Sequence, residues 1–154
     1  GFINRIFPQS KYILMLRHPC DTVLSCFMAD FKINEGMANF YTLDDTVNFY
    51  NEFFTLWSHY TNVLNIQFHM IKYEDVVLNF EQTIKSLMNF LNLEWENSLK
   101  DFNKKAQERI KINTPSYSQV IKPLYNKSIN RWKKYEIMDK FYPLLEKWIK
   151  EFNY

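Results

Sequence analysis

The distribution of apolar residues along the chain predicts two buried strands separated by helices. Residues 12–16 form a short apolar run between polar neighbours, which is typical of a buried parallel strand. Residues 67–72 form a second run of this kind. Between them, residues 43–64 carry apolar side chains at helical spacing, and Thr42 with Asp45 resembles the start of a capping box. The order strand, helix, helix, strand, helix indicates a helix-rich α/β fold with a parallel sheet.

The remaining segments are assigned by the same patterns. Apolar stripes predict further helices, at residues 19–31, 77–92, 126–132 and 139–152, the last interrupted or restarted at Pro143. Residues 96–110 are predicted to be weakly helical, residues 34–40 to be a loop or a short helix, and residues 113–125 to be a loop. No repeats or low-complexity segments interrupt this organisation, so residues 1–154 are predicted to form a single domain.

Composition narrows the possible functions. With 47% hydrophobic and 18% aromatic residues, the 154-residue chain can form a core, which excludes intrinsic disorder. A net charge of +2 argues against nucleic-acid binding. The three histidines are scattered, so no metal site is predicted. No stretch approaches the length of a membrane span, and Cys20 and Cys26 fit reduced thiols, so we predict a cytoplasmic protein.

Candidate functional residues cluster at the end of the first predicted strand. Arg17 follows the apolar run, and Pro19 then favours an immediate helical start because its ring fixes φ. A helix N-terminus beside an arginine is suited to binding an anion. Ser25 lies two helical turns after His18 and returns to the same side, so its hydroxyl could join Arg17 on one phosphate.

Several blocks in order resemble the PAPS-dependent sulfotransferases, which use 3′-phosphoadenosine 5′-phosphosulfate. Residues 17–25 resemble the family's R-D-P-x-D-x-x-x-S, with histidine at the second position where the acid is usual. Residues 114–125 and 131–135 resemble T-P-S-x-x-Q-V-x-x-P-x-Y and R-W-x-x-Y. Residues 71–75 resemble a strand that runs into Y-E-D, and residues 148–154 resemble the last helix. The chain is most similar to the tyrosylprotein branch and to bacterial sulfotransferase domains that follow tetratricopeptide repeats.

The resemblance implies a function and a set of site residues. The protein would bind PAPS, transfer its sulfuryl group to an acceptor hydroxyl or amine, and release PAP. Arg17 and Ser25 would bind the 3′-phosphate, and Tyr73, at the end of the second strand, would contact the nucleotide. Ser116 would act close to the transferred group and the 5′-phosphate, as the catalytic residue. Lys122 would reach the nucleotide phosphates.

The scarcity of glycine qualifies this expectation. Gly1 and Gly36 are the only glycines, and a phosphate-binding loop needs several so that the backbone can approach the anion. We therefore expect the C-terminal portion of a sulfotransferase domain: a P-loop-NTPase-like three-layer fold without its N-terminal strand and phosphate loop. The catalytic base would lie upstream, and this chain alone would be inactive. The resemblance implies as partners the missing N-terminal half of the domain, tetratricopeptide repeats as in the bacterial branch, and a small-molecule or peptide acceptor.

Two other functions fit parts of the pattern. The chain could be a non-catalytic nucleotide-binding or interaction remnant of the same fold. It could also belong to a P-loop kinase-like phosphotransferase, although residues 116–122 have no recognised kinase counterpart. A comparison of PAP and ATP binding would distinguish the three possibilities.

Overall fold

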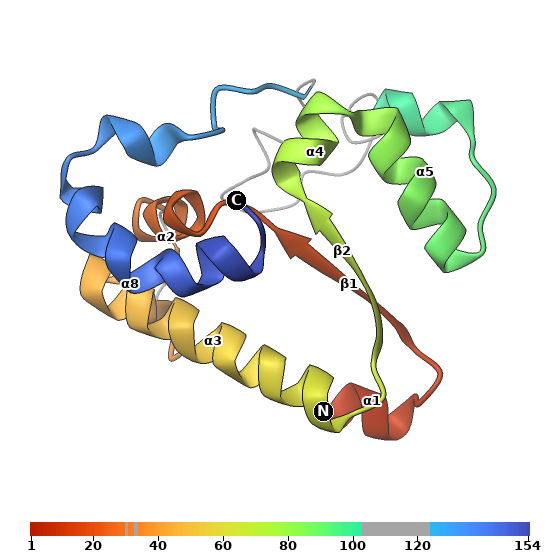
Figure 1. Ribbon diagram of the computed structural model, residues 1–154, viewed down its shortest axis with the longest axis horizontal. Helices are drawn as coiled ribbons and strands as arrows, with labels where there is room; N and C mark the ends of the chain where they lie inside the picture. Colours follow the sequence, from red (N-terminus) through yellow and green to blue (C-terminus); the bar gives the residue numbers. More distant parts are fainter. Residues whose placement is uncertain (30, 33, 103–123) are drawn as a thin grey trace.

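The computed structural model describes residues 1–29, 31, 32, 34–102 and 124–154. Helices outnumber strands in these residues (Figure 1). The elements in chain order are α1 (Phe2–Ile6), β1 (Lys11–Leu16), α2 (Pro19–Phe27), η1 (Met37–Phe40), α3 (Leu43–Val63), β2 (Gln67–Lys72), α4 (Tyr73–Leu78), α5 (Phe80–Leu91), η2 (Asn97–Asp101), η3 (Arg131–Lys134) and α8 (Ile137–Glu151).

The two strands pair in parallel, as predicted. The register joins Lys11 to Gln67 at one end and Leu16 to Lys72 at the other, so the strands begin and end together. Because side chains alternate along a strand, Leu14 and Leu16 point to one face of the sheet and Ile13 and Met15 to the other. The fold is therefore a helix-rich mixture of α and β with a small parallel sheet.

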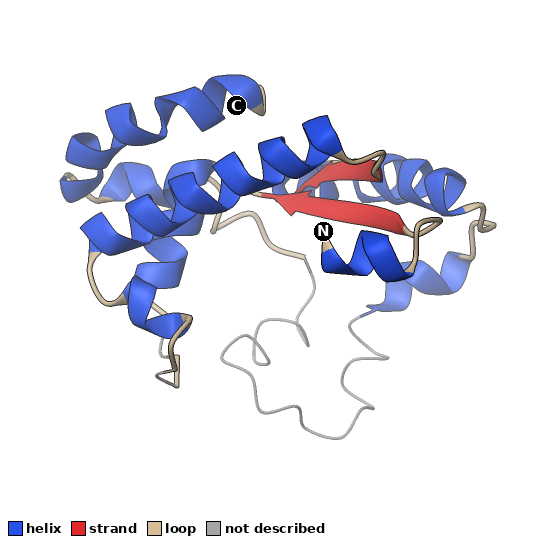
Figure 2. Cartoon of the chain, turned by 90° about the horizontal axis from the view of Figure 1, so that it is seen from below, coloured by secondary structure: helices blue, strands red, loops and turns tan. Residues whose placement is uncertain are grey.

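The hydrophobic core lies on the face to which Leu14 and Leu16 point. Helix α3 begins at Leu43, where Thr42 Oγ1 accepts a hydrogen bond from the Asp45 backbone N–H over 3.1 Å, as the predicted cap requires. In Figure 2, α3 passes over the strands and α8 lies beyond them, beside α3. The core residues come from β1, α2, α3, η3 and α8 and its end: Leu14, Leu16, Cys20, Val23, Leu24, Val47, Tyr50, Phe54, Trp132, Met138, Phe141, Leu145, Trp148, Ile149 and Phe152.

The opposite face is covered over β2 by α5. His69 stacks on Phe90 with ring centroids 5.3 Å apart, and Ile71 is buried. The prediction of one helix over residues 77–92 was wrong in two respects. A helical turn begins at Tyr73, directly after the strand, and the helical path breaks at Asn79, whose φ and ψ of −136° and 48° are not helical.

Strand β1 is covered less than its sequence predicts. Ile13 is 47% exposed and Met15 59% exposed, whereas Leu14 and Leu16 are buried. A strand that is apolar on both faces suits a central position in a larger sheet. In this structure only one face of β1 is fully packed.

Helix boundaries differ from the prediction at three further places. Helix α2 ends at Phe27 and does not reach residue 31. Of residues 126–132, only Arg131 and Trp132 are helical, at the start of the short 3-10 helix η3 (Arg131–Lys134). Helix α8 runs through Pro143 without interruption. Pro143 is exposed, so the carbonyl that lacks a helical partner can face solvent, while Phe141 and Leu145 anchor the helix on both sides of it. Helix α1 was not predicted.

Within the described residues, no helix combines the length and the apolar character that a membrane crossing requires.

The exposed face of β1 predicts self-association of this 154-residue chain when it is produced alone. Replacing Ile13 and Met15 together by threonine and lysine should shift the chain toward monomer, because two apolar side chains on one strand face favour association. Size-exclusion chromatography with light scattering measures the change. Leu56→Lys is the matched control, since Leu56 is a 50% exposed residue of α3. A monodisperse, cooperatively unfolding wild-type monomer would contradict the prediction.

Candidate functional site

The parallel register brings two predicted site residues together at the carboxyl edge of the sheet. Leu16 pairs with Lys72, so Arg17 and Tyr73 follow side by side. The Arg17 guanidinium carbon lies 5.3 Å from the centroid of the Tyr73 ring, a cation–π contact. Ligands of open α/β sheets bind at this edge. Tyr73 is the first residue of α4 and not the last of the strand, which corrects its predicted place by one element.

Arg17 and Tyr73 both hold the backbone of the segment that precedes η3. The Arg17 Nη2 donates to the Ser128 carbonyl over 2.6 Å, and the Tyr73 hydroxyl donates to the Tyr125 carbonyl over 3.2 Å. Burial, and then the neighbouring Tyr125, raise the pKa of Tyr73, so its hydroxyl remains a hydrogen-bond donor at neutral pH. This segment therefore lies across the ends of the two strands.

A buried acid lies on the other side of Arg17. Asp21 is 1% exposed, and its Oδ1 lies 3.9 Å from Arg17 Nη2 and accepts the Trp132 backbone N–H over 2.8 Å. Asp21 Oδ2 and Arg17 Nε are buried without a hydrogen-bond partner among the described residues. The carboxylate balances the arginine and fixes η3 against α2.

The remaining predicted site residues are not joined to Arg17 by any described contact. Ser25 is exposed on α2, one turn beyond Asp21 and on the same side of the helix, with no hydrogen bond to Arg17 or Tyr73. Ser116 and Lys122 lie outside the described residues. The structure thus brings Arg17 and Tyr73 together and leaves Ser25 open to solvent near them.

His18 explains the departure from the family motif. Its imidazole Nδ1 accepts a hydrogen bond from the Cys20 backbone N–H over 3.2 Å and so caps α2. An aspartate oxygen makes the same kind of capping hydrogen bond in many helices. One consequence is that the Cys20 N–H is not available to an anion, and Pro19 has none. The sequence predicted an anion site made of Arg17 and the free N–H groups at the start of α2. Because the first two positions of α2 offer no free N–H, anion binding there would depend mainly on the Arg17 side chain.

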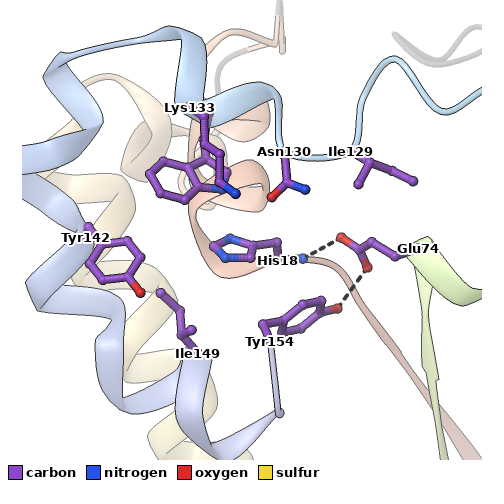
Figure 3. Close-up of a pocket in the computed structure, with 9 residues that line it drawn as sticks. His18, Glu74, Ile129, Asn130, Lys133, Tyr142, Ile149 and Tyr154 are labelled. Carbon is purple, nitrogen blue, oxygen red and sulfur yellow. Dashed lines mark hydrogen bonds between the residues drawn. The ribbon is translucent and has the colours of Figure 1, made fainter.

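Glu74 links three parts of the chain near this cap (Figure 3). Its Oε1 accepts the His18 backbone N–H over 3.0 Å, and its Oε2 accepts the Tyr154 hydroxyl over 3.0 Å. Glu74 lies in the first turn of α4, and no side-chain hydrogen bond caps this helix. Its carboxylate, however, reaches away from its own helix to the end of β1 and to the end of the chain.

A pocket of about 500 Å³ adjoins these contacts. It is lined by His18, Glu74, Ile129, Asn130, Trp132, Lys133, Tyr142, Ile149 and Tyr154. The rings form a stack, with Trp132 5.3 Å from His18 and 5.5 Å from Tyr142 between ring centroids. Sequence reasoning missed this pocket because its residues come from four separate segments. Residues 17–25, 71–75, 131–135 and 148–154, all of which resemble family blocks, each contribute lining residues, but none of these blocks by itself predicts a pocket.

Among the described residues there is no group of three or more His, Cys, Asp or Glu side chains that could hold a metal ion. The site instead offers a guanidinium, hydroxyls and aromatic rings, a set suited to an anionic group attached to a planar ring.

A family model and one named relative both indicate the sulfotransferases. The model of the Sulfotransferase family matches residues 1–97. An uncharacterized protein of Aquifex aeolicus (strain VF5) is 26% identical over 137 residues, which cover 88% of this chain and 18% of that protein. Protein-tyrosine sulfotransferase 2 of Gallus gallus is 27% identical over 143 residues, which cover 85% of this chain and 36% of that protein. The chain therefore spans a minor part of each relative's length.

The His18 cap predicts a pH-dependent contribution to stability. Burial lowers the pKa of His18 below 6.5, and Lys133 and Arg17 add to this, while Asp21 and Glu74 oppose it. The unfolded chain therefore binds the proton first as the pH falls. The stabilising contribution is complete above pH 6.5 and is lost between pH 6.5 and the lower pKa of the folded state.

Urea unfolding of the wild type and of His18→Asn between pH 7.5 and 5.5 tests this. Asparagine caps helices without titrating, so the wild type should lose more stability on acidification than the variant, by at most about 1.4 kcal/mol per pH unit. His59→Gln, an exposed position on α3, is the control. Equal slopes for His18→Asn and the wild type would show that the cap does not titrate.

Proposed function

Because the chain belongs to the sulfotransferase family, we propose that the protein binds PAPS and transfers its sulfuryl group to an acceptor hydroxyl or amine. The observation that carries the proposal is the place of Arg17. Its guanidinium stands where two parallel strands end, against the Tyr73 ring and beside the start of α2. A phosphate can meet a charged donor there without any contribution from glycine-rich backbone.

The proposed reaction is an in-line displacement at sulfur. A bond forms between sulfur and the acceptor oxygen or nitrogen while the bond between sulfur and the 5′-phosphate oxygen breaks. The acceptor proton passes to a base, and PAP leaves with the electron pair of the broken bond. Such chemistry depends on positioning and on neutralising charge at the leaving phosphate.

In this proposal the residues of the chain mainly hold the nucleotide. Arg17 binds the 3′-phosphate, with Ser25 as a second donor from α2, and Tyr73 contacts the nucleotide through its ring. By their resemblance to the family block, Ser116 acts near the transferred group and Lys122 near the phosphates.

We also propose that the chain is the C-terminal part of a sulfotransferase domain with a P-loop-like fold, acting with an upstream part that holds the 5′-phosphosulfate. The exposed face of β1 supports this arrangement, because an additional layer would cover Ile13 and Met15. The acceptor is a small molecule or a peptide.

The family match does not favour the alternative of a non-catalytic remnant. A transfer assay distinguishes the two: the full-length protein is incubated with PAPS and a panel of phenolic, alcoholic and amine acceptors, and PAP release is followed. Acceptor-dependent PAP release supports the enzyme. Tight PAP binding without release for any acceptor supports the remnant.

Substitutions at the proposed 3′-phosphate site should have graded effects on PAP affinity. Arg17→Ala should weaken PAP binding about tenfold or more, because a charge-assisted hydrogen bond contributes about 1.5–3 kcal/mol. Ser25→Ala should weaken it about fivefold, since a neutral donor contributes about 1 kcal/mol. Calorimetric titration with PAP and with adenosine 5′-monophosphate, which lacks the 3′-phosphate, measures both. If Arg17→Ala lowers the affinity for both ligands by the same factor, Arg17 does not bind the 3′-phosphate.

Lys122, which belongs to the block of residues 114–125, provides an independent test of the proposed function. Lys122→Ala should lower the rate of sulfuryl transfer about tenfold or more, because a cation at the phosphates stabilises charge that develops on the leaving group. Lys105→Ala is the matched control, since Lys105 belongs to no family block. Steady-state rates of sulfuryl transfer at saturating acceptor measure the effect. If Lys122→Ala and Lys105→Ala have equal rates, Lys122 does not act at the phosphates.

A further inference from the structure

The peptide group that follows Arg17 is held at both of its polar atoms. Its N–H, which belongs to His18, donates to Glu74 Oε1 over 3.0 Å. Its carbonyl, which belongs to Arg17, lies 3.3 Å from the Thr22 hydroxyl, which shares its hydrogen bond with the His18 carbonyl at the same distance. These two contacts fix the plane of the peptide and hence the direction in which the Arg17 side chain leaves the backbone.

Glu74 is itself held from the end of the chain. The Tyr154 hydroxyl donates to Glu74 Oε2 over 3.0 Å, and burial together with the adjacent Glu74 raises the pKa of Tyr154, so that hydroxyl stays a donor. Lys72 secures the same end, because its Nζ donates to the Asn153 carbonyl over 2.8 Å and lies 4.5 Å from the Tyr154 ring centroid. The carboxylate is thus oriented by residues that follow α8.

The contacts of Glu74 define its role. Both of its oxygens accept hydrogen bonds, and it forms no ion pair with another described residue. A carboxylate occupied at both oxygens is poorly suited to remove a proton from an acceptor. It is well suited to hold two donors, one at the end of β1 and one at the end of the chain.

We propose that Glu74 is a positioning residue for recognition of the 3′-phosphate. By holding the His18 N–H, and with Tyr154 orienting it, Glu74 sets the direction of the Arg17 guanidinium and so determines how strongly the protein prefers a nucleotide that carries a 3′-phosphate. This inference rests on the proposed function, which assigns the 3′-phosphate to Arg17.

The test compares affinities for PAP and for adenosine 5′-monophosphate, measured by calorimetry on the full-length protein. The two ligands differ only in the 3′-phosphate, so their affinity ratio reports on the arginine site. Glu74→Ala should lower this ratio about tenfold, as Arg17→Ala does, because the side chain can no longer make its charge-assisted contacts in the required direction. The affinity for adenosine 5′-monophosphate should change less than about twofold, because that ligand does not use this contact.

Two milder variants separate hydrogen bonding from charge. In Glu74→Gln the amide oxygen can still accept the His18 N–H and the amide nitrogen can donate to the Tyr154 oxygen, so the affinity ratio should return to within about twofold of the wild type. Tyr154→Phe leaves the His18 contact but frees the carboxylate, and should lower the ratio about threefold.

A merely structural role is tested by Asn51→Ala. Asn51 Oδ1 accepts the Trp148 indole N–H over 2.8 Å, away from the strand ends. This variant should lower the unfolding temperature without changing the affinity ratio. If Glu74→Ala does not fold, Glu74→Gln and Tyr154→Phe decide, because a retained ratio in Tyr154→Phe contradicts the proposal.

The outcomes also separate this inference from the proposed function. If the wild type prefers PAP and Arg17→Ala loses the preference, but Glu74→Ala and Tyr154→Phe keep it, the positioning role is wrong and the proposed function stands. If the wild type binds the two nucleotides equally, the 3′-phosphate assignment fails and the positioning role fails with it. If Glu74→Gln loses the ratio as fully as Glu74→Ala, the negative charge acts and the hydrogen bonds do not.

Discussion

The arrangement of the site depends on the parallel pairing of β1 with β2 in a register that ends both strands at the same level. Leu16 pairs with Lys72, and the chain leaves each strand directly into a helix. Arg17 and Tyr73 must then meet, and the start of α2 must stand beside the first turn of α4. An antiparallel pair would have placed these residues at opposite edges of the sheet. The contact of Arg17 with Tyr73 follows from this constraint, whereas its contact with Asp21 follows from their i,i+4 spacing at the start of α2.

The core explains why this edge can be rigid although the sheet is small. Trp132, Trp148 and Phe152 pack on the face to which Leu14 and Leu16 point, and Cys20 and Val23 attach α2 to the same cluster. Arg17 and His18 are therefore held between a packed strand and a packed helix. The other face of β1 has no such cover, so the rigidity that the site requires comes from one side of the sheet alone.

The sequence was sufficient for the features that local patterns encode. The apolar runs identified both strands, and Thr42 identified the start of α3, because a strand pattern and a cap are properties of a few adjacent residues. The start of α4 at Tyr73 was missed because the helical pattern was assigned only from residue 77, although Glu74 and Asp75 are acidic residues of the first turn of α4. The continuity of α8 through Pro143 was missed because it depends on tertiary packing around Phe141 and Leu145, which overrides the local preference.

The same distinction applies to the site. Arg17 and Tyr73 could be predicted from motif blocks, and the register then made them neighbours. Asp21 was visible only as a motif position, although its bond to the Trp132 N–H joins segments 111 residues apart. Glu74 was visible only as a position of the Y-E-D block, because its partners, the His18 N–H and the Tyr154 hydroxyl, come from distant parts of the chain. Contacts of this kind arise from tertiary structure and leave no local signal.

The charges at the strand ends nearly cancel. Under the proposed function, recognition of a phosphate would therefore depend on the orientation of Arg17 more than on the local electrostatic potential. The cations Arg17, Lys72 and Lys133 stand near two carboxylates, Asp21 and Glu74. Asp21 is buried, so solvent screens its effect on Arg17 only weakly. In the proposed function, a phosphate would therefore meet only a modest positive potential, and its affinity would depend on the direction in which the guanidinium presents its N–H groups. A site of this kind needs a rigidly oriented arginine, which the contacts at both atoms of the following peptide provide.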